Sequence, residues 1–190
     1  RMFFTYRGAL FWRMNAGLGD VVFSPLYQVL VERGATFEFF HRLRNVGVGE
    51  AAEGAHVSRL DFDVQARIKG ERAYQPLVEV NQVPCWPSRP DYRQLVNGAR
   101  LEREGRRFES HWDDRRETTR SLRVGDDFDF VVLGVSVSAL PHVASELIAR
   151  SPRWRDMVRH VKTVPTQALQ LWLRSDARAL GWPHEAGANV

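Results

Sequence analysis

The chain has 190 residues, 44% of them hydrophobic and 11% aromatic, and its 27 basic residues outnumber 23 acidic ones to give a formal net charge of +4. This composition is typical of a globular protein with a substantial core, and no run approaches the ~18 uncharged apolar residues of an integral membrane segment. The basic residues are interspersed with acidic ones and form no stripe that could follow a phosphate backbone, so we expect no nucleic-acid partner.

The first elements are predicted to be two helices. Residues 3–14 are apolar and aromatic nearly all round, as in a buried helix. Gly17 and Gly19 predict a turn, and Asp20 is the expected N-cap of the second helix. That helix carries its apolar residues on one face and is expected to stop at Gly34.

Three extended segments are expected next, at residues 37–48, 59–69 and 74–80. The middle segment alternates apolar and polar residues, which indicates a strand of an antiparallel sheet with one buried and one solvated face. Residues 84–90 contain three prolines, which fix the backbone and remove hydrogen-bond donors, so we expect no regular structure there. Asp91 is expected to cap a short helix that reaches residue 97.

The rest of the chain begins with a polar region, residues 100–127, that includes an exposed strand at 118–124. The remaining elements are a fully apolar, buried strand at 128–135, helices at 140–150 and 152–160, a strand at 164–173 and a helical turn at 176–180. Gly134, inside the apolar strand, fits two interpretations: a ligand close to the backbone, or a structural role in a bulge or in tight helix–strand packing. This order of elements predicts a mixed α+β fold.

Few residues in the sequence indicate a catalytic, disulfide or metal site. Cys85 is the only cysteine, which excludes an internal disulfide and favours a cytoplasmic location. The six histidines are scattered without a pair at the spacing that places two ligands on one helix face, so we expect no metal site. The sequence does not indicate an oligomeric state.

Three segments form an ordered set. They are Gly17-Leu-Gly-Asp-Val-Val with its helix, Phe37-Glu-Phe-Phe-His-Arg-Leu-Arg-Asn-Val46, and Asp129-Phe-Val-Val-Leu-Gly-Val-Ser136. Together they resemble the flavin-containing amine oxidase and phytoene desaturase superfamily of FAD-dependent oxidoreductases. Members of this superfamily follow a glycine turn and helix with a strand, and later return with an Asp-x-Val-Val-x-Ala-x-Pro strand. Ser136 departs from that pattern, in which proline is usual.

The resemblance implies FAD in an extended pose, a small-molecule substrate, and hydride removal from a C–H or C–N bond of that substrate, which we expect to be apolar. Residues 1–58 and 125–150 would belong to the FAD-binding fold. Residues 59–124 and 151–190 would belong to a substrate domain with an antiparallel sheet. The cofactor-binding positions that the resemblance implies are Leu43, Val46, Gly134, Val135 and Ser136.

Gln167 and Trp172 are the candidates for the substrate pocket. The segment around Gln167 is similar to the strand in which many amine oxidases place a lysine beside the flavin. Glutamine at that position implies a desaturase-like or dehydrogenase-like reaction. Gln167 also fits an ordinary residue at a sheet edge, and no catalytic residue is identified.

The chain contains no Gly-x-Gly-x-x-Gly phosphate loop, and its ends carry no capping or closing element. We therefore expect an internal fragment of an oxidoreductase, which binds FAD weakly and is inactive by itself. The alternative is a non-catalytic α+β module whose aromatic face lines an apolar ligand pocket or a subunit interface. That face would contain Phe37, Phe39, Phe62 and Trp172.

Overall fold

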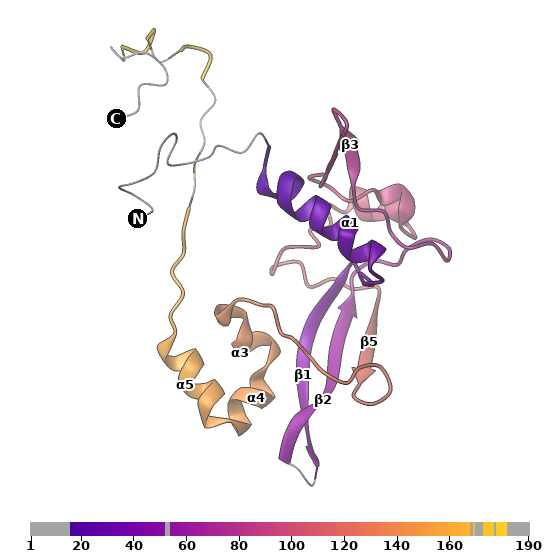
Figure 1. Ribbon diagram of the computed structural model, residues 1–190, viewed down its shortest axis with the longest axis vertical. Coiled ribbons are helices and arrows are strands. Elements are labelled where there is room, and N and C mark those ends of the chain that lie inside the picture. The colour runs from indigo at the N-terminus through magenta and orange to yellow at the C-terminus, as the bar shows by residue number, and fades with distance from the viewer. Residues whose placement is uncertain (1–15, 52–53, 168, 170–172, 177, 182–190) are drawn as a thin grey trace.

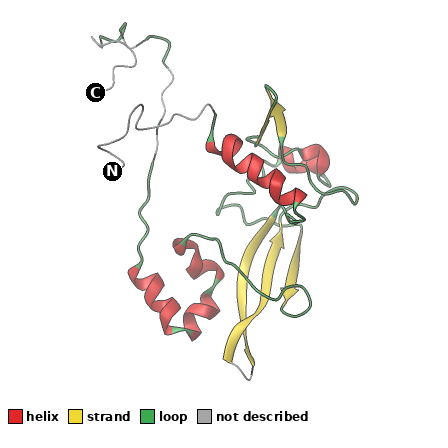
Figure 2. Cartoon of the chain, viewed as in Figure 1, coloured by secondary structure: helices red, strands yellow, loops and turns green. Residues whose placement is uncertain are grey.

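The computed structural model describes residues 16–51, 54–167, 169, 173–176 and 178–181. Helices and an antiparallel sheet share this part of the chain, which confirms the mixed α+β class (Figure 1, Figure 2). No helix in the described ranges is long and apolar enough to cross a membrane. The helix predicted over residues 3–14 lies outside the described residues.

The sheet has three antiparallel strands in the order β1-β2-β5. These strands are β1 (His41–Ala51), β2 (Gly54–Val64) and β5 (Thr118–Arg123). The predicted alternation is confirmed in β2, where Leu60 and Val64 are buried on one face. Pairing ends at Val64 because the opposite chain turns at Phe40, whose φ is 61°. The domain boundary predicted after residue 58 falls inside β2, so the β1–β2 hairpin joins the two segments.

The helical segment before the sheet begins with one π-helical turn, η1 (Gly19–Phe23), and continues as α1 (Ser24–Glu32). The second predicted helix is therefore confirmed, but the prediction that Asp20 caps it is wrong. Asp20 lies inside the first turn, and its Oδ1 accepts the backbone N–H of Trp86 at 3.0 Å. The carboxylate thus ties the start of this segment to a loop far along the chain.

A short hairpin follows β2 and pairs β3 (Val78–Val80) with β4 (Val83–Cys85). Asn81 and Gln82 make its turn with φ values of 50° and 62°, as a two-residue hairpin loop requires. The prediction of irregular structure from residue 84 is wrong for the first two residues, Pro84 and Cys85. Proline is tolerated here because each strand of this hairpin is an edge strand.

Asp91 caps the next element, the 3₁₀ turn η2 (Tyr92–Gln94), by accepting the backbone N–H of Arg93 at 3.0 Å, as predicted. The Arg93 guanidinium also donates to this carboxylate and lowers the pKa of Asp91 to about 2. The cap therefore stays ionised down to strongly acidic pH. Helix α2 (Gly98–Arg103) follows directly.

Two clusters of buried side chains hold these elements together. The first lies between the sheet and three short helices, α3 (Leu140–Val143), α4 (Ser145–Arg150) and α5 (Pro152–His160). Figure 1 shows these helices on the β1 side of the sheet, where α3 and α4 contact β1 and α5 packs on α4. The buried members of the first cluster are Val46, Leu60, Leu140 and Ala144. The buried members of the second cluster, at the other end of the sheet, are Ala66, Tyr74, Leu95 and Leu101.

The helices after residue 135 follow the prediction with one break. Helix α5 has the predicted bounds. The helix predicted over residues 140–150 is divided at Ala144, whose φ of −132° and ψ of 34° are not helical. Ala144 is fully buried in the first cluster, and the break turns α4 back towards β1.

The apolar segment 128–135 is not a strand, contrary to the prediction. Among the described residues it forms a single bridge, between Val124 and Phe128, and no ladder. Val131 and Leu133 pack against the first cluster, whereas Phe130 and Val132 are 92% and 96% exposed. A fully apolar run predicts a strand between two neighbours, and the described part of the chain supplies neither neighbour. The strand predicted over 164–173 is likewise absent from the described residues of that range.

Helix α4 is fastened to the edge of β1 by Glu146. Its Oε1 accepts from Asn45 Nδ2 at 2.9 Å, and its Oε2 accepts from the backbone N–H of Val48 at 3.0 Å. These donors, the Val48 N–H foremost, hold the pKa of the Glu146 carboxyl below its ordinary value of 4.5. We expect Glu146→Gln to lower the free energy of unfolding at pH 7 by about 1–2 kcal/mol, as measured by urea denaturation.

The effect of Glu146→Gln should depend on pH in a defined direction. Because folding lowers the pKa of Glu146, its stabilisation is complete above the unfolded pKa and is lost as the pH falls through the folded pKa. The wild-type and variant stabilities should converge as the pH drops below about 4.5. Glu50→Gln is the control, because Glu50 pairs with Arg150 on the surface and should change stability by less than about 0.5 kcal/mol. A wild-type advantage that persists at about pH 2 would contradict this role.

Candidate functional site

A groove lies where β1 meets the turn that follows the apolar segment 128–135. Its volume is about 730 Å³. Leu43 lines it from β1, and Ser138 lines it from the 3₁₀ turn η3 (Val137–Ala139). Leu43 is a predicted cofactor position, and Ser138 hydrogen-bonds through its Oγ to the Oγ of another, Ser136, at 2.9 Å. The fold therefore brings two distant segments of the sequence to the same groove.

The β1 wall of this groove is cationic. Arg42, Arg44 and Arg116 surround one carboxylate, that of Asp63, at N–O distances of 2.8, 3.6 and 3.2 Å. Asp63 is 1% exposed, so this charge is enclosed by its three partners. Arg42 and Arg44 line the groove with Asp114, whereas Arg116 and Asp63 lie outside its lining. The exposed guanidinium of Arg44 can attract an anion there.

Arg42 is the arginine most firmly held in this cluster. Its Nη1 donates to the carbonyl of Asp113 at 2.7 Å, and its Nη2 donates to the carbonyl of Asp114 at 3.0 Å. Its Nε is buried and has no hydrogen-bond partner among the described residues. His111 and His142, whose ring centroids are 5.3 Å apart, also line the groove. A guanidinium held in place beside two imidazoles suits a phosphate-like ligand.

The other predicted cofactor positions are divided between the core and the surface. Val46 is 1% exposed, so its side chain packs inside the first cluster. Gly134 is exposed, and a Cβ added there would meet no described atom within 4 Å, so the tight-packing interpretation of this glycine is wrong. Val135 is 40% exposed, and Ser136 is exposed beside the groove.

Of the two predicted substrate-pocket residues, the structure describes only Gln167. Gln167 is exposed and lies outside regular structure, and Trp172 lies outside the described residues. The aromatic face of the alternative interpretation is divided, because Phe39 packs against the second cluster and Phe62 against the first. Phe39 lines the aromatic pocket described next, whereas Phe37 and Phe62 do not.

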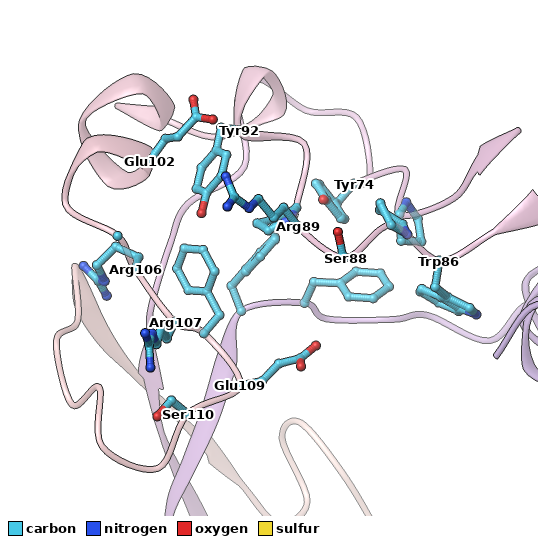
Figure 3. Close-up of a pocket in the computed structure, with 17 residues that line it drawn as sticks. Tyr74, Trp86, Ser88, Arg89, Tyr92, Glu102, Arg106, Arg107, Glu109 and Ser110 are labelled. Carbon is cyan, nitrogen blue, oxygen red and sulfur yellow. The ribbon is translucent and has the colours of Figure 1, made fainter. Parts of the chain in front are cut away.

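An aromatic pocket of about 830 Å³ lies at the other end of the sheet from α3–α5 (Figure 3). Sequence-distant segments meet around it: the residues before β1, the proline-rich loop at 86–90, the turn η2, and residues 105–110 after α2. Its aromatic lining residues are Phe39, Phe40, Tyr74, Trp86, Tyr92 and Phe108. A cavity of this size and lining is typical of a small-molecule site.

Phe40 organises the floor of this pocket. Its ring meets those of Tyr74 and Phe108 edge-on, with a centroid distance of 5.0 Å to each. Its backbone is held in the left-handed region, at a φ of 61°, while its carbonyl accepts the N–H of Gln65 at 2.7 Å. A bulky residue in this conformation is strained, and the aromatic contacts and the hydrogen bond offset that strain.

Arg106 fixes the wall formed by residues 105–110. Its side chain is 3% exposed, and its Nη2 donates to the carbonyls of Gln65 at 3.1 Å and Arg115 at 2.6 Å. The guanidinium also lies 5.6 Å from the ring centroid of Phe108. These contacts bind the wall to the end of β2.

The pocket and the groove share one segment of chain. Ser110 lines the aromatic pocket, and the next residue, His111, lines the cationic groove. Residues 110 and 111 therefore connect the walls of the two cavities. Within the described ranges, no group of three His, Cys, Asp or Glu side chains could hold a metal ion.

Comparisons of the chain with protein-family models, with curated proteins and with solved structures found no match.

Proposed function

We propose that this chain is part of an FAD-dependent oxidoreductase, in which the cationic groove binds the cofactor and the aromatic pocket binds an apolar substrate. The observation that carries the proposal is the meeting of Leu43 and the turn after residue 135 at one groove. These are the two segments to which the resemblance assigns cofactor contacts. The two segments are far apart in the sequence, and the order of the motifs alone does not require them to line the same groove. Their meeting therefore supports the proposal.

The residues of the groove fit a dinucleotide. FAD carries two phosphates, and the groove offers two arginines, Arg42, which backbone carbonyls hold in place, and the half-exposed Arg44. Leu43 and Val143 add apolar surface for a ring system. Bound flavin would supply the hydride-accepting chemistry. The chain would hold the anionic part of the cofactor at the arginines, and it would exclude water from the substrate with the aromatic rings.

The shared segment at Ser110 and His111 supports the same proposal. A hydride transfer needs the substrate carbon close to the cofactor, so the two binding sites must adjoin. The exposed apolar side chains of Phe130 and Val132 are also consistent with a further element packing on segment 128–135 in the intact enzyme.

Flavin binding is the direct test. We expect the intact protein that contains this chain to purify with the absorbance spectrum of bound FAD. In that protein Arg44→Glu should raise the Kd for FAD about tenfold, because it replaces a cation at the groove by an anion. Titrations followed by quenching of flavin fluorescence provide the measurement.

Arg153→Glu is the matched control for this titration. Arg153 is exposed on α5 and lies outside the groove, so the same charge reversal there should leave the Kd unchanged. A colourless protein that is indifferent to FAD would end the proposal. Equal losses in the two variants would show that net charge acts, and not the groove.

A non-catalytic ligand-binding module is the second candidate, and the aromatic pocket favours it. It would bind an apolar ligand in the pocket without any flavin in the groove. The same titrations separate the two candidates, because the module would retain ligand binding in a protein that does not bind FAD.

A further inference from the structure

We propose that Arg89 makes the aromatic pocket a site for an apolar molecule that carries a carboxylate. Arg89 lies in the proline-rich loop that forms one wall of the pocket. Aromatic rings supply the remaining surface, and apolar rings that surround one cationic group match a ligand with an apolar body and an anionic end.

The loop holds Arg89 in a defined position. Pro90 restricts the backbone of Arg89, and Pro87 fixes its own φ two residues earlier. The loop is also anchored at both ends. The N–H of Trp86 donates to Asp20 at 3.0 Å, and the N–H of Asp91 donates to the Tyr74 hydroxyl at 2.9 Å. These restraints fix the point of the loop from which the exposed side chain of Arg89 reaches the pocket.

Arg89 has no hydrogen-bond or ion-pair partner of its own within the described part of the chain. The neighbouring arginines that stabilise the fold differ in this respect, since Arg93 and Arg115 each pair with an aspartate. Figure 3 shows the Arg89 side chain extending from the loop towards Tyr92, with Ser88 beside it. The hydroxyl groups of Tyr92 and Ser88 could donate to the same carboxylate as the guanidinium.

Two acidic residues also line the pocket and must be weighed against Arg89. Glu102 and Glu109 would attract a cationic ligand, whereas Arg107 on the same wall would repel it. Arg106 is committed to the fold by Asp113 and Glu117, each 3.8 Å from its guanidinium nitrogens. The exposed charges of the lining are therefore balanced, and an anion is favoured at Arg89 because its guanidinium has no partner among the described residues.

This inference rests on the proposed function in one respect: the carboxylate ligand is a substrate only if the protein is an oxidoreductase. Binding of a carboxylate at Arg89 can be measured without flavin. If the protein binds a carboxylate at Arg89 but does not bind FAD, the proposed oxidoreductase function is refuted and the carboxylate site stands. If it binds FAD but no carboxylate at Arg89, only the carboxylate site is refuted.

The experiment uses three probes of nearly the same shape and different charge: 1-naphthylacetate, the neutral 1-naphthylacetamide and the cationic 2-(1-naphthyl)ethylamine. Isothermal titration of the full chain should give the lowest Kd for 1-naphthylacetate. Arg89→Gln should raise the Kd of the carboxylate about tenfold and leave that of the amide unchanged. Arg103→Gln is the control and should have little effect on either probe, because Arg103 is exposed on α2 and does not line the pocket.

Thermal melts of both variants establish that the fold is retained, and Arg89→Lys, which keeps the charge, should recover part of the affinity. Equal Kd values for 1-naphthylacetate and 1-naphthylacetamide would overturn the proposal. A lowest Kd for 2-(1-naphthyl)ethylamine would overturn it too. Equal losses in Arg89→Gln and Arg103→Gln, or no binding of 1-naphthylacetate to the wild type, would overturn it as well.

Discussion

Replacing Arg106 by methionine is expected to lower the free energy of unfolding by about 3–5 kcal/mol. The substitution removes the donor that the buried carbonyl of Gln65 shares with the partly buried carbonyl of Arg115, and a buried carbonyl without a partner costs about 1–3 kcal/mol. It also removes the positive charge 3.8 Å from the carboxylates of Asp113 and Glu117. Those carboxylates retain other arginine partners, so most of the loss comes from the carbonyls and from the changed packing.

Urea denaturation of the full chain measures this loss. Arg106→Lys should recover only a small part of the stability, because an ammonium cannot reach both carbonyls and both carboxylates as the planar guanidinium does. Arg103→Met is the matched control. Arg103 is exposed on α2, three residues earlier, so its replacement should change stability by less than about 0.5 kcal/mol. Similar effects of Arg106→Met and Arg103→Met would show that the buried contacts of Arg106 contribute little.

The parts of the fold that could be predicted depend on signals local in the sequence. The alternation in β2, the cap at Asp91 and the proline that opens α5 each act within a few residues. Backbone geometry converts such patterns directly into structure, whatever the rest of the chain does. These elements therefore needed no knowledge of their neighbours.

The failures involve partners that are distant in the sequence. Asp20 has the chemistry of an N-cap, but the N–H of Trp86 occupies its carboxylate. Segment 128–135 has the composition of a buried strand, but a strand also needs neighbours. Arg106 stands in a region of mixed charge that is typical of a solvated surface, and no local signal distinguishes it from Arg103 or Arg107.

The candidate site was predicted in part. The resemblance directed attention to Leu43 and to the segment around Ser136, which meet at the groove. It gave no indication of the aromatic pocket, because that pocket is assembled from segments that only the tertiary fold brings together. The three prolines around Arg89 were the one available signal, since a rigid loop of aromatic and basic residues often carries function.

The substitution Gly98→Ala tests how closely the wall of this pocket is packed, and we expect it to lower the free energy of unfolding by about 3 kcal/mol. A Cβ at Gly98 would overlap the carbonyl oxygen of Tyr92. Since that oxygen belongs to the backbone, no side-chain rotation can relieve the overlap, and either η2 or α2 must shift. Leu95 and Leu101 are both 0% exposed and lie in these two elements or next to them, so a shift of either disturbs the second cluster.

Gly134→Ala is the control for Gly98→Ala, because a Cβ there meets no described atom within 4 Å and should change stability by less than about 0.5 kcal/mol. The two variants add the same methyl group, so urea denaturation compares only its surroundings. Gly98→Ala should also weaken binding of 1-naphthylacetate, since Tyr92 lines the pocket while Arg89 is untouched. If Gly98→Ala is as stable as Gly134→Ala, η2 and α2 can move apart without loss of unfolding free energy. In that case the aromatic pocket would not be the rigid, preformed cavity on which its selectivity for a carboxylate depends.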